Sequence, residues 1–589
     1  MMKKFLSAAL SLGLIGATLP VPVHANDDRD RDGRAKFKHV LLVSIDGMHA
    51  VDYLNCSKGI SGVNEGEPYC PNLAELGENG ITYRDTSTSR PSDSFPGLTA
   101  IISGSSPRTA GAFYDVAYDR VLAPPTITTG NGVAGGTCTP GVPNGTTTEY
   151  EEGIDKNQGF VNGIDGISTA NGDGGINSID PMKLIRDPFK NCAPVYPWNF
   201  VRTNTIFGVA HAAGLYTAWA DKHPAYASVN GPGDGKNVND FYGPEINSNV
   251  VGLPGVATVE GVDCSTVQDT NSDLSAWTNG FQNIKCYDTL KVNAVLNQID
   301  GYNHNRSKKT KVPAIFGMNF QAVSVGQKLI QKDPTTKAVV ATGGYLDSTG
   351  TPTAPLLSDI QFTDKAIGAW VHELKKEGLY ESTLIIITAK HGQSPIDSAR
   401  YLGIANSTDD PISNDPATIL DNAGCLPFSE APPNPTGIGP TEDDVALLWL
   451  NNSCSTADAV SLLRSTSPTT TNIAGIGEIF SGRLLTSYFN APGIPPNGDP
   501  RTPDIVVTPN IGVTYSGSTK KLAEHGGFSR DDTNVMMLIA NPSFDRKTVT
   551  SPVETMQVAP TILKALGLDP EALDGVRLEG TQSLPSLPF

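Results

Sequence analysis

Short apolar runs that end in polar residues recur along the chain, and the first of them sets the pattern. The segment from Val40 to Ile45 reads VLLVSI and is followed at once by Asp46 and Gly47. So short and apolar a run is typical of a buried parallel strand, which brings the next residue to the carboxyl edge of a sheet. We therefore predict a strand at 39–45 with Asp46 at the edge where ligands of α/β proteins gather.

Further runs of this kind alternate with segments of helical periodicity. Such alternation is typical of an α/β fold, and we predict a three-layer α/β/α sandwich with a mostly parallel central sheet. The expected strands are 39–45, 215–220, 314–318, 383–389, 446–450 and 504–508. The expected helices include 94–103, 290–298, 362–377 and 555–566.

A serine stands at the expected start of the helix 94–103. Pro96 takes an early helical position, and the residues from Leu98 onward are mostly apolar, as at a helix N-terminus. The first turn of a helix presents unpaired N–H groups and the positive end of the helix dipole, an environment that suits a phosphate under attack. Ser94 and Asp46 are therefore a candidate nucleophile and metal ligand.

The charge of the chain argues against one class of partner. The formal net charge is −18, and an acidic protein is a poor candidate for binding nucleic acid through a basic face. We therefore expect no nucleic-acid-binding face and a small-molecule substrate.

The N-terminal residues predict export. Lys3 and Lys4 precede an apolar stretch and a small-residue cleavage pattern at 23–25, which is typical of a secretory signal peptide. We predict cleavage after Ala25, a periplasmic or secreted protein, and no transmembrane segment. A charged spacer at 26–37 then precedes one domain at 38–589, with loop insertions near 123–191 and 422–441.

The cysteines agree with this compartment. All eight follow residue 25, their number is even, and none forms a CxxC motif, so a zinc ribbon is not expected. The simplest expectation is four disulfides between sequence neighbours. These are Cys56–Cys70, Cys138–Cys192, Cys264–Cys286 and Cys425–Cys454.

Charged residues and histidines follow several of the expected strands. Lys222 and His223 come after the strand 215–220, and Lys390 and His391 come after the strand 383–389. A later glycine-rich turn reads EHGG and contains His525. We expect these side chains to converge with Asp46 and Ser94 on one rim of the sheet.

The order of these motifs resembles the alkaline phosphatase superfamily. IDG after the first strand, SFPG before a helix, KHG after a later strand, EHGG and a closing VAPTIL helix run from about residue 38 to 567. Within the superfamily they resemble the type I phosphodiesterase/nucleotide pyrophosphatase family. The resemblance implies a hydrolase that moves a phosphoryl group onto its own Ser or Thr and then onto water, helped by two zinc ions.

The resemblance assigns roles to four residues. Asp46 matches the metal carboxylate of the first strand, and Ser94 matches the nucleophile, which is also a metal ligand. His391 matches the histidine of the Asp-His-Gly metal motif, and His525 matches the late histidine of the other metal site.

Four positions depart from the family pattern. Lys390 stands for the aspartate before His391, and Gly97 for the asparagine that ends the nucleophile motif. Val323 and Gln327 align with the Asp-x-x-x-His ligands, although valine cannot bind zinc and glutamine does so poorly. We therefore expect at most one divalent ion, zinc by the resemblance, and a metal-free site is possible. Lysine would instead supply a fixed positive charge for phosphoryl oxygens.

The remaining expectations concern roles around Ser94. We expect Lys390, His525 and His223 to stabilise the substrate anion or to act as acid or base. The expected substrate-binding residues are Lys222, Gly97, Gln321 and Gln327.

The predicted function is that of an exported hydrolase of phosphate diesters or monoesters. One alternative is a non-catalytic relative that binds an anion or a partner. The other is a sulfatase-like or metal-free esterase, in which Lys390 or a histidine activates Ser94.

Overall fold

The structure is a computed structural model and describes residues 36–153, 175–248, 250–266, 277–333, 335–404, 415–427, 441–465 and 475–589. The signal peptide predicted at 1–25 lies outside these residues, as does all of the spacer 26–37 except its last two positions. Much of the two predicted insertions also lies outside them, at 154–174 and 428–440.

A sheet with parallel strands at its centre carries the candidate site. In the described part of the chain this sheet has eight strands. Their order is β22 (Lys547–Val549), β2 (Gly80–Tyr83), β21 (Leu538–Ala540), β13 (Thr383–Thr388), β1 (His39–Ile45), β10 (Ile315–Phe320), β8 (Ala218–Ala220) and β9 (Asp240–Tyr242). The strands from β13 to β9 are all parallel, and β21 is antiparallel to both of its neighbours. The mostly parallel central sheet is thereby confirmed.

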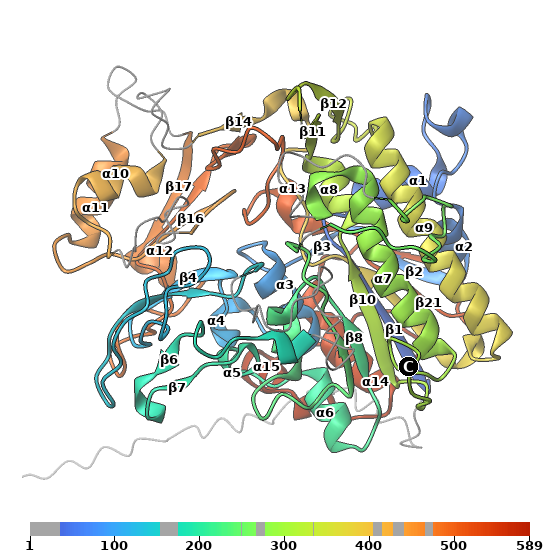
Figure 1. The fold of residues 1–589 in the computed structure, drawn as a ribbon, viewed down its shortest axis with the longest axis horizontal. Helices are drawn as coiled ribbons and strands as arrows, with labels where there is room; N and C mark the ends of the chain where they lie inside the picture. The colour runs from blue at the N-terminus through green and yellow to red at the C-terminus, as the bar shows by residue number, and fades with distance from the viewer. Residues whose placement is uncertain are drawn as a thin grey trace, which may run out of the picture. The chain divides into compact units, whose positions relative to one another are not determined.

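Helices cover both faces of this sheet (Figure 1). Leu41, Val43 and Ile45 of β1 pack in a core that includes residues of α7 (Phe281–Ile299) and α9 (Ala354–Lys376). Val40 and Leu42 point to the other face and pack with residues of α3 (Ser94–Ser103) and α14 (Val558–Ala565). Successive side chains of a strand alternate between faces, so a run that is apolar throughout is buried on both sides. The three-layer α/β/α architecture is confirmed.

Two predicted strands belong to a different sheet. The runs predicted at 446–450 and 504–508 form β16 (Ala446–Leu448) and β18 (Ile505–Pro509), which pair antiparallel to each other. Together with β15 (Thr441–Glu442) and β17 (Ile476–Ser481) they make a four-stranded sheet, seen on the left of Figure 1. Apolar runs specify burial and leave open which sheet a strand joins.

All four predicted disulfides are confirmed. The structure pairs Cys56 with Cys70, Cys138 with Cys192, Cys264 with Cys286 and Cys425 with Cys454. Each pairs a cysteine with the next one along the sequence. Loops closed in this way lose conformational freedom mainly in the unfolded chain.

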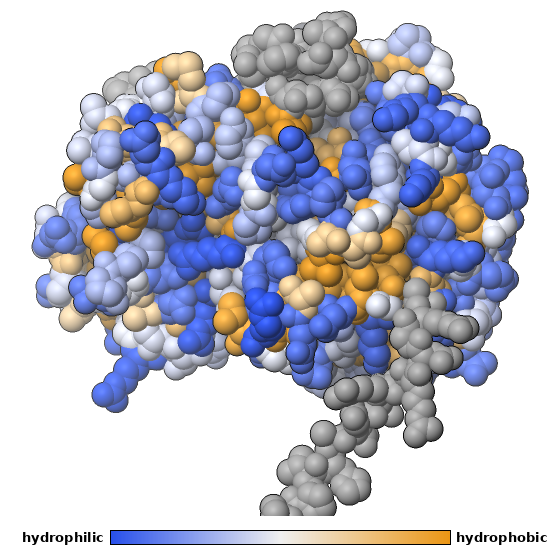
Figure 2. Space-filling view, turned by 90° about the horizontal axis from the view of Figure 1, so that it is seen from below, coloured by the Kyte–Doolittle hydropathy of each residue, from blue (hydrophilic) through white to orange (hydrophobic). Residues whose placement is uncertain are grey.

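The surface mixes the two kinds of side chain. Hydrophilic and hydrophobic residues are interspersed on the face shown in Figure 2. Among the described helices, none has the length and apolar character needed to cross a membrane.

Candidate active site

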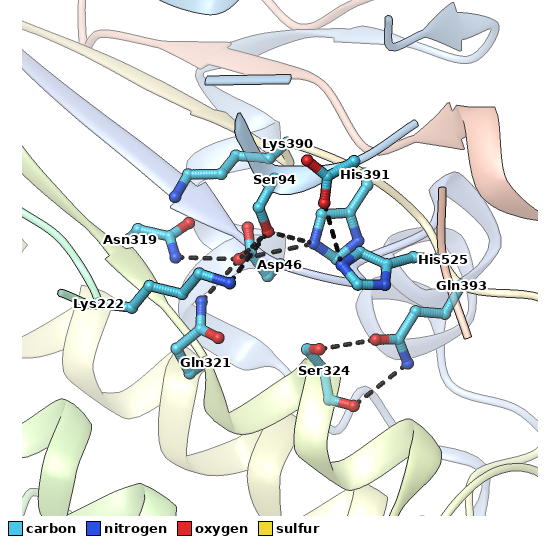
Figure 3. Close-up of polar contacts among 12 residues, drawn as sticks. Asp46, Ser94, Lys222, Asn319, Gln321, Ser324, Lys390, His391, Gln393 and His525 are labelled. Carbon is cyan, nitrogen blue, oxygen red and sulfur yellow. Dashed lines mark hydrogen bonds and ion pairs between the residues drawn. The ribbon is translucent and has the colours of Figure 1, made fainter. Parts of the chain in front are cut away.

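Four parallel neighbours of the central sheet bring polar residues to one edge. The carboxyl ends of β8, β10, β1 and β13 are followed by Lys222, Gln321, Asp46 and His391. Because these strands are parallel and adjacent, the residues after them meet at the same edge. Figure 3 shows Lys222, Gln321 and His391 directed at Ser94 and Asp46.

Ser94 is the first residue of α3 and is fully buried. Asp93 caps the helix by accepting a hydrogen bond of 3.0 Å from the Phe95 N–H. The Oγ of Ser94 lies 3.0 Å from His391 Nε2 and 3.4 Å from both Lys222 Nζ and Asp46 Oδ2. A hydroxyl within hydrogen-bonding distance of an imidazole is the arrangement that activates a serine nucleophile.

His391 is oriented as a proton acceptor. Its Nδ1 lies 2.8 Å from the carbonyl oxygen of Gly392, which can only accept, so Nδ1 carries the proton in the neutral ring. Nε2 then offers its lone pair to the Ser94 hydroxyl. Burial lowers the pKa of His391, although Asp46 opposes the shift, so the ring is neutral at pH 7.

Asp46 is surrounded by donors. Its Oδ2 accepts hydrogen bonds from Gln321 Nε2 at 2.6 Å and from Asn319 Nδ2 at 3.1 Å, besides its contact with Ser94. Burial alone would raise the pKa of this carboxyl, but Lys390, His391 and Lys222 together outweigh it, so the pKa lies well below its usual range. Asp46 is therefore ionised, and the amide of Gln321 holds its carboxylate and lines the cavity.

Lys222 supplies the positive charge that touches Ser94. Besides its contact with Ser94 Oγ, its Nζ forms an ion pair of 3.0 Å with Glu152. Burial lowers the pKa of Lys222, but Glu152 and other nearby carboxylates outweigh it, and the net pKa is raised. The ammonium is thus fixed beside the hydroxyl.

Lys390, which was expected to fill this role, has other partners. Its Nζ lies 2.7 Å from Asp221 Oδ1 and 3.9 Å from the centre of the Tyr226 ring. Lys390 and Asp221 are both fully buried, and Asp221 also accepts a hydrogen bond from Trp219 Nε1 at 2.9 Å. The amine of Lys390 points away from Ser94 (Figure 3). Its charge acts on Asp46 without contact with Ser94.

Three other predicted residues lie away from Ser94. A Cβ on Gly97 would come within 2.3 Å of the Lys390 carbonyl oxygen, so this position allows close packing and presents no side chain to a substrate. Gln327 Nε2 donates to the Gly47 carbonyl at 2.8 Å and to Tyr345 Oη at 2.8 Å. His223 is fully buried against Tyr226, and burial lowers its pKa to about 3.

These placements correct the predicted roles of the three residues. Gly97 has no atoms beyond its backbone to offer, Gln327 holds the loop after β1, and His223 has neither contact with Ser94 nor a place in the cavity wall. A sequence motif locates such residues near a strand end, but it does not fix the direction in which each side chain points.

His525 lies beside His391. The ring centres are 4.1 Å apart, and His525 Nε2 lies 3.6 Å from Asp93 Oδ1. Burial lowers the pKa of His525 well below its usual range, and the charge of His391 acts in the same direction. His525 is therefore a neutral ring at pH 7 and lines the cavity beside His391.

A cavity of about 370 Å³ opens onto Ser94. Lys222, Gln321, His391 and His525 contribute to its wall. Glu524 of the EHGG motif also lies in the wall. The rest of the wall includes charged and polar residues that the sequence motifs did not single out, namely Tyr114, Asp115, Glu151, Glu152, Lys328, Glu442, Asp443 and Lys521. They come from segments far apart in the chain.

The family's metal ligands are only partly present. One group that could hold an ion consists of Asp443, Glu524 and His525, but Lys521 forms an ion pair with Glu524 there. Asp115, Glu151 and Glu152 form a second such group, and Lys222 forms an ion pair with Glu152. Near Ser94, Asp46 and His391 remain.

Comparison with known proteins assigns the chain to a family. A family model described as type I phosphodiesterase/nucleotide pyrophosphatase matches residues 40–143 and 295–529. No curated protein matches the sequence. Murine ectonucleotide pyrophosphatase/phosphodiesterase 5 is a similar solved structure, 13% identical with a TM-score of 0.48, covering 90% of this chain and 95% of that chain.

Two further solved structures are similar. The human ectonucleotide pyrophosphatase/phosphodiesterase 5 is 12% identical with a TM-score of 0.46 and covers 94% of this chain and 97% of its own. The alkaline phosphatase PafA is 11% identical with a TM-score of 0.48 and covers 90% of this chain and 96% of its own. Because the family model matches more than half of the sequence, the chain belongs to the type I phosphodiesterase/nucleotide pyrophosphatase family of phosphate-ester hydrolases.

Proposed function

We propose that the protein hydrolyses small phosphate esters with Ser94 as its nucleophile. The observation that carries the proposal is the position of Ser94 Oγ, at a helix N-terminus, 3.0 Å from His391 Nε2 and 3.4 Å from Lys222 Nζ. One group accepts the proton, another stabilises negative charge, and the helix end attracts the phosphate. The cavity beside them suits a small molecule.

The reaction follows from these residues. His391 Nε2 takes the Ser94 proton while Ser94 Oγ attacks phosphorus, and the bond to the leaving oxygen breaks. Lys222 stabilises the phosphoryl oxygens, and an N–H of the neutral His525 supports the leaving oxygen. Water then attacks phosphorus, the bond from phosphorus to Ser94 Oγ breaks, and the proton on His391 returns to Ser94 Oγ. The proton that the water loses passes to solvent or to the leaving oxygen released in the first step. Asp46 stabilises the imidazolium that forms on His391, since its Oδ2 lies 3.6 Å from Nε2.

The residues at the site do not fit the two-zinc centre that the family pattern implies. Zinc takes three or four nitrogen, sulfur or carboxylate ligands. Asp46 Oδ2 already accepts from two amides, and an ammonium group lies beside Ser94. At the other position Val323 and Gln327 replace two ligands. We therefore propose that at most one divalent ion binds and that the chemistry near Ser94 runs without it.

The proposal includes export. Four disulfides are typical of proteins that mature in an oxidising compartment, which supports the signal peptide predicted at 1–25. Expression of the full chain in a secreting host should yield a mature protein that begins at Asn26. A mature protein that retains Met1 would contradict this part of the proposal.

Turnover of bis(4-nitrophenyl) phosphate tests the nucleophile. Ser94→Ala should abolish release of 4-nitrophenolate, and rapid quenching of the wild-type reaction should trap a 4-nitrophenyl phosphoryl group on Ser94, detectable by mass spectrometry. Ser103→Ala removes a buried hydroxyl at the other end of the same helix and should remain active. Equal turnover by Ser94→Ala and wild type would refute the proposal. Phosphate binding without any turnover would favour the non-catalytic alternative.

A further inference from the structure

Lys328 is a cation in the wall of the Ser94 cavity that lacks a counter-ion among the described residues. It is the last residue of α8 (Ala322–Lys328) and is half-buried. Its amine forms no hydrogen bond or ion pair with any residue that the structure describes. Burial lowers the pKa of Lys328, and the charges of Lys521 and Lys222 add to that effect, while Glu524 opposes it.

The other lysines of the cavity already have partners. Lys222 is paired with Glu152 at 3.0 Å, and Lys521 is paired with Glu524. Lys222 also contacts Ser94 Oγ and is assigned to the phosphoryl group under attack. Lys328 is therefore the cavity lysine that neither a described carboxylate nor the proposed reaction already occupies.

The acidic residues of the cavity have other partners. Asp443 accepts a hydrogen bond of 2.6 Å from Tyr114, and Glu151 accepts one from Asn131 Nδ2. Glu152 and Glu524 form ion pairs with Lys222 and Lys521. In the described part of the chain, none of these carboxylates forms an ion pair with Lys328.

We propose that Lys328 forms a second anion-binding position in the cavity, which takes a carboxylate or phosphate group of the substrate other than the phosphoryl group attacked by Ser94. This inference rests on the proposed function, because the second anionic group belongs to the substrate that Ser94 attacks. The substrate is then a phosphate ester with a further anionic group. An ammonium paired with such a group in a partly dehydrated cavity contributes more than a surface ion pair does.

Ligand binding tests this position without catalysis. Calorimetry would compare inorganic phosphate, 3-phosphonopropionate and 1,3-propanediphosphonate, since the last two differ in whether the second group is a carboxylate or a phosphonate. The wild-type protein should bind at least one two-anion ligand about ten- to a hundredfold more tightly than phosphate. Lys328→Met should remove most of that preference and change phosphate affinity less than about twofold, while Lys328→Arg should retain it.

Lys236→Met is the matched control, because Lys236 is an exposed lysine outside the cavity, and it should bind all three ligands as the wild type does. Circular dichroism and thermal unfolding would verify that each variant is folded. Should Lys328→Met misfold, Lys328→Gln serves in its place. An absent preference in the wild type, or an equal loss of affinity for all three ligands in the folded variant, overturns the inference.

Turnover separates this inference from the proposed function. Aryl phosphodiesters with and without a carboxylate on the second substituent would be compared in wild type and Lys328→Met. A selective rise of KM for the carboxylated diester supports the second anion position. Failure of the wild type to hydrolyse either diester counts against the proposed function, whereas the calorimetric comparison still decides the binding position.

Discussion

Lys222 Nζ lies 3.4 Å from Ser94 Oγ. This contact puts a positive charge beside the proposed nucleophile, and the lysine follows β8, the strand next to β10, and is not part of the KHG motif. A fixed donor aimed at the reacting atoms lowers the barrier because it needs no reorganisation during the reaction.

Removal of this amine should slow the reaction strongly. We expect Lys222→Met to lower kcat about 10²- to 10³-fold on an aryl phosphodiester, as loss of one preorganised donor does. Glu152 is partly exposed, so water can solvate it and the fold should persist. Steady-state kinetics would check this, and Lys375→Met, which changes an exposed lysine, is the control. An unchanged kcat would mean that Lys222 only forms an ion pair with Glu152 and does not take part in catalysis.

Lys390→Met should act mainly on stability. It leaves the fully buried Asp221 without its counter-ion, and such a loss costs about 3–5 kcal/mol. Urea unfolding should register this cost, and Lys390→Met combined with Asp221→Asn should recover part of it. Full stability of the single variant together with lost activity would instead favour the original expectation that Lys390 acts on the substrate anion.

Gly97→Ala should damage the site through the backbone. The added Cβ would come within 2.3 Å of the Lys390 carbonyl oxygen, so α3 or the loop after β13 must move. We expect a loss of about 1–3 kcal/mol, typical of overpacking, and reduced turnover because Ser94 starts the same helix. Gly208→Ala, whose Cβ would meet only the side chain of Asn237, should be harmless. Equal behaviour of the two variants in thermal unfolding and kinetics would contradict this reasoning.

The pH profile should report His391. Burial lowers its pKa below the ordinary value of 6.5, and only the neutral ring can accept the Ser94 proton. We therefore expect kcat/KM to stay level from pH 7.5 to 6.5 and to fall only as the pH drops through the lowered pKa. Asp46 remains ionised over that range because its own pKa is lowered. An acid limb with a midpoint above 6.5 would contradict His391 as the base.

Chelation should leave the activity largely intact. Val323, Gln327 and Lys390 stand at three positions where the family has metal ligands, and too few ligands remain for a two-zinc site. Removal of divalent ions with dipicolinate should therefore change kcat/KM less than about twofold. Metal analysis of the treated protein would verify that removal succeeded. Loss of activity that Zn²⁺ restores would show that Asp46, His391 or His525 holds a required ion.

Local sequence signals gave the positions of the main elements. The strand at His39–Ile45 and the helix at Ser94–Ser103 have the predicted bounds, because an apolar run and a capped helix start depend on adjacent residues. The four disulfides also join sequence neighbours, for which loop closure is short. The motifs further predicted that Asp46 and Ser94 would meet side chains following other strands, among them Lys222, Lys390, His391 and His525.

The direction of individual side chains was beyond such signals. Lys222 and Lys390 both follow central strands, yet one amine contacts Ser94 and the other contacts Asp221. The partner of each lysine depends on the side chains that pack around it, such as Tyr226 for Lys390 and Glu152 for Lys222. Those residues come from segments that the sequence does not link to the motif.

The sequence by itself determined the main strands and helices, the cysteine pairs and the place of Ser94 at a helix start, since each depends on residues close together in the chain. Only the tertiary structure decided that β16 and β18 form a separate sheet, that Lys390 is buried in an ion pair, and that Lys328 has no ion-pair partner among the described residues of the Ser94 cavity. The physical reason is that charge balance and burial depend on contacts between distant segments, and those contacts exist only once the chain has folded.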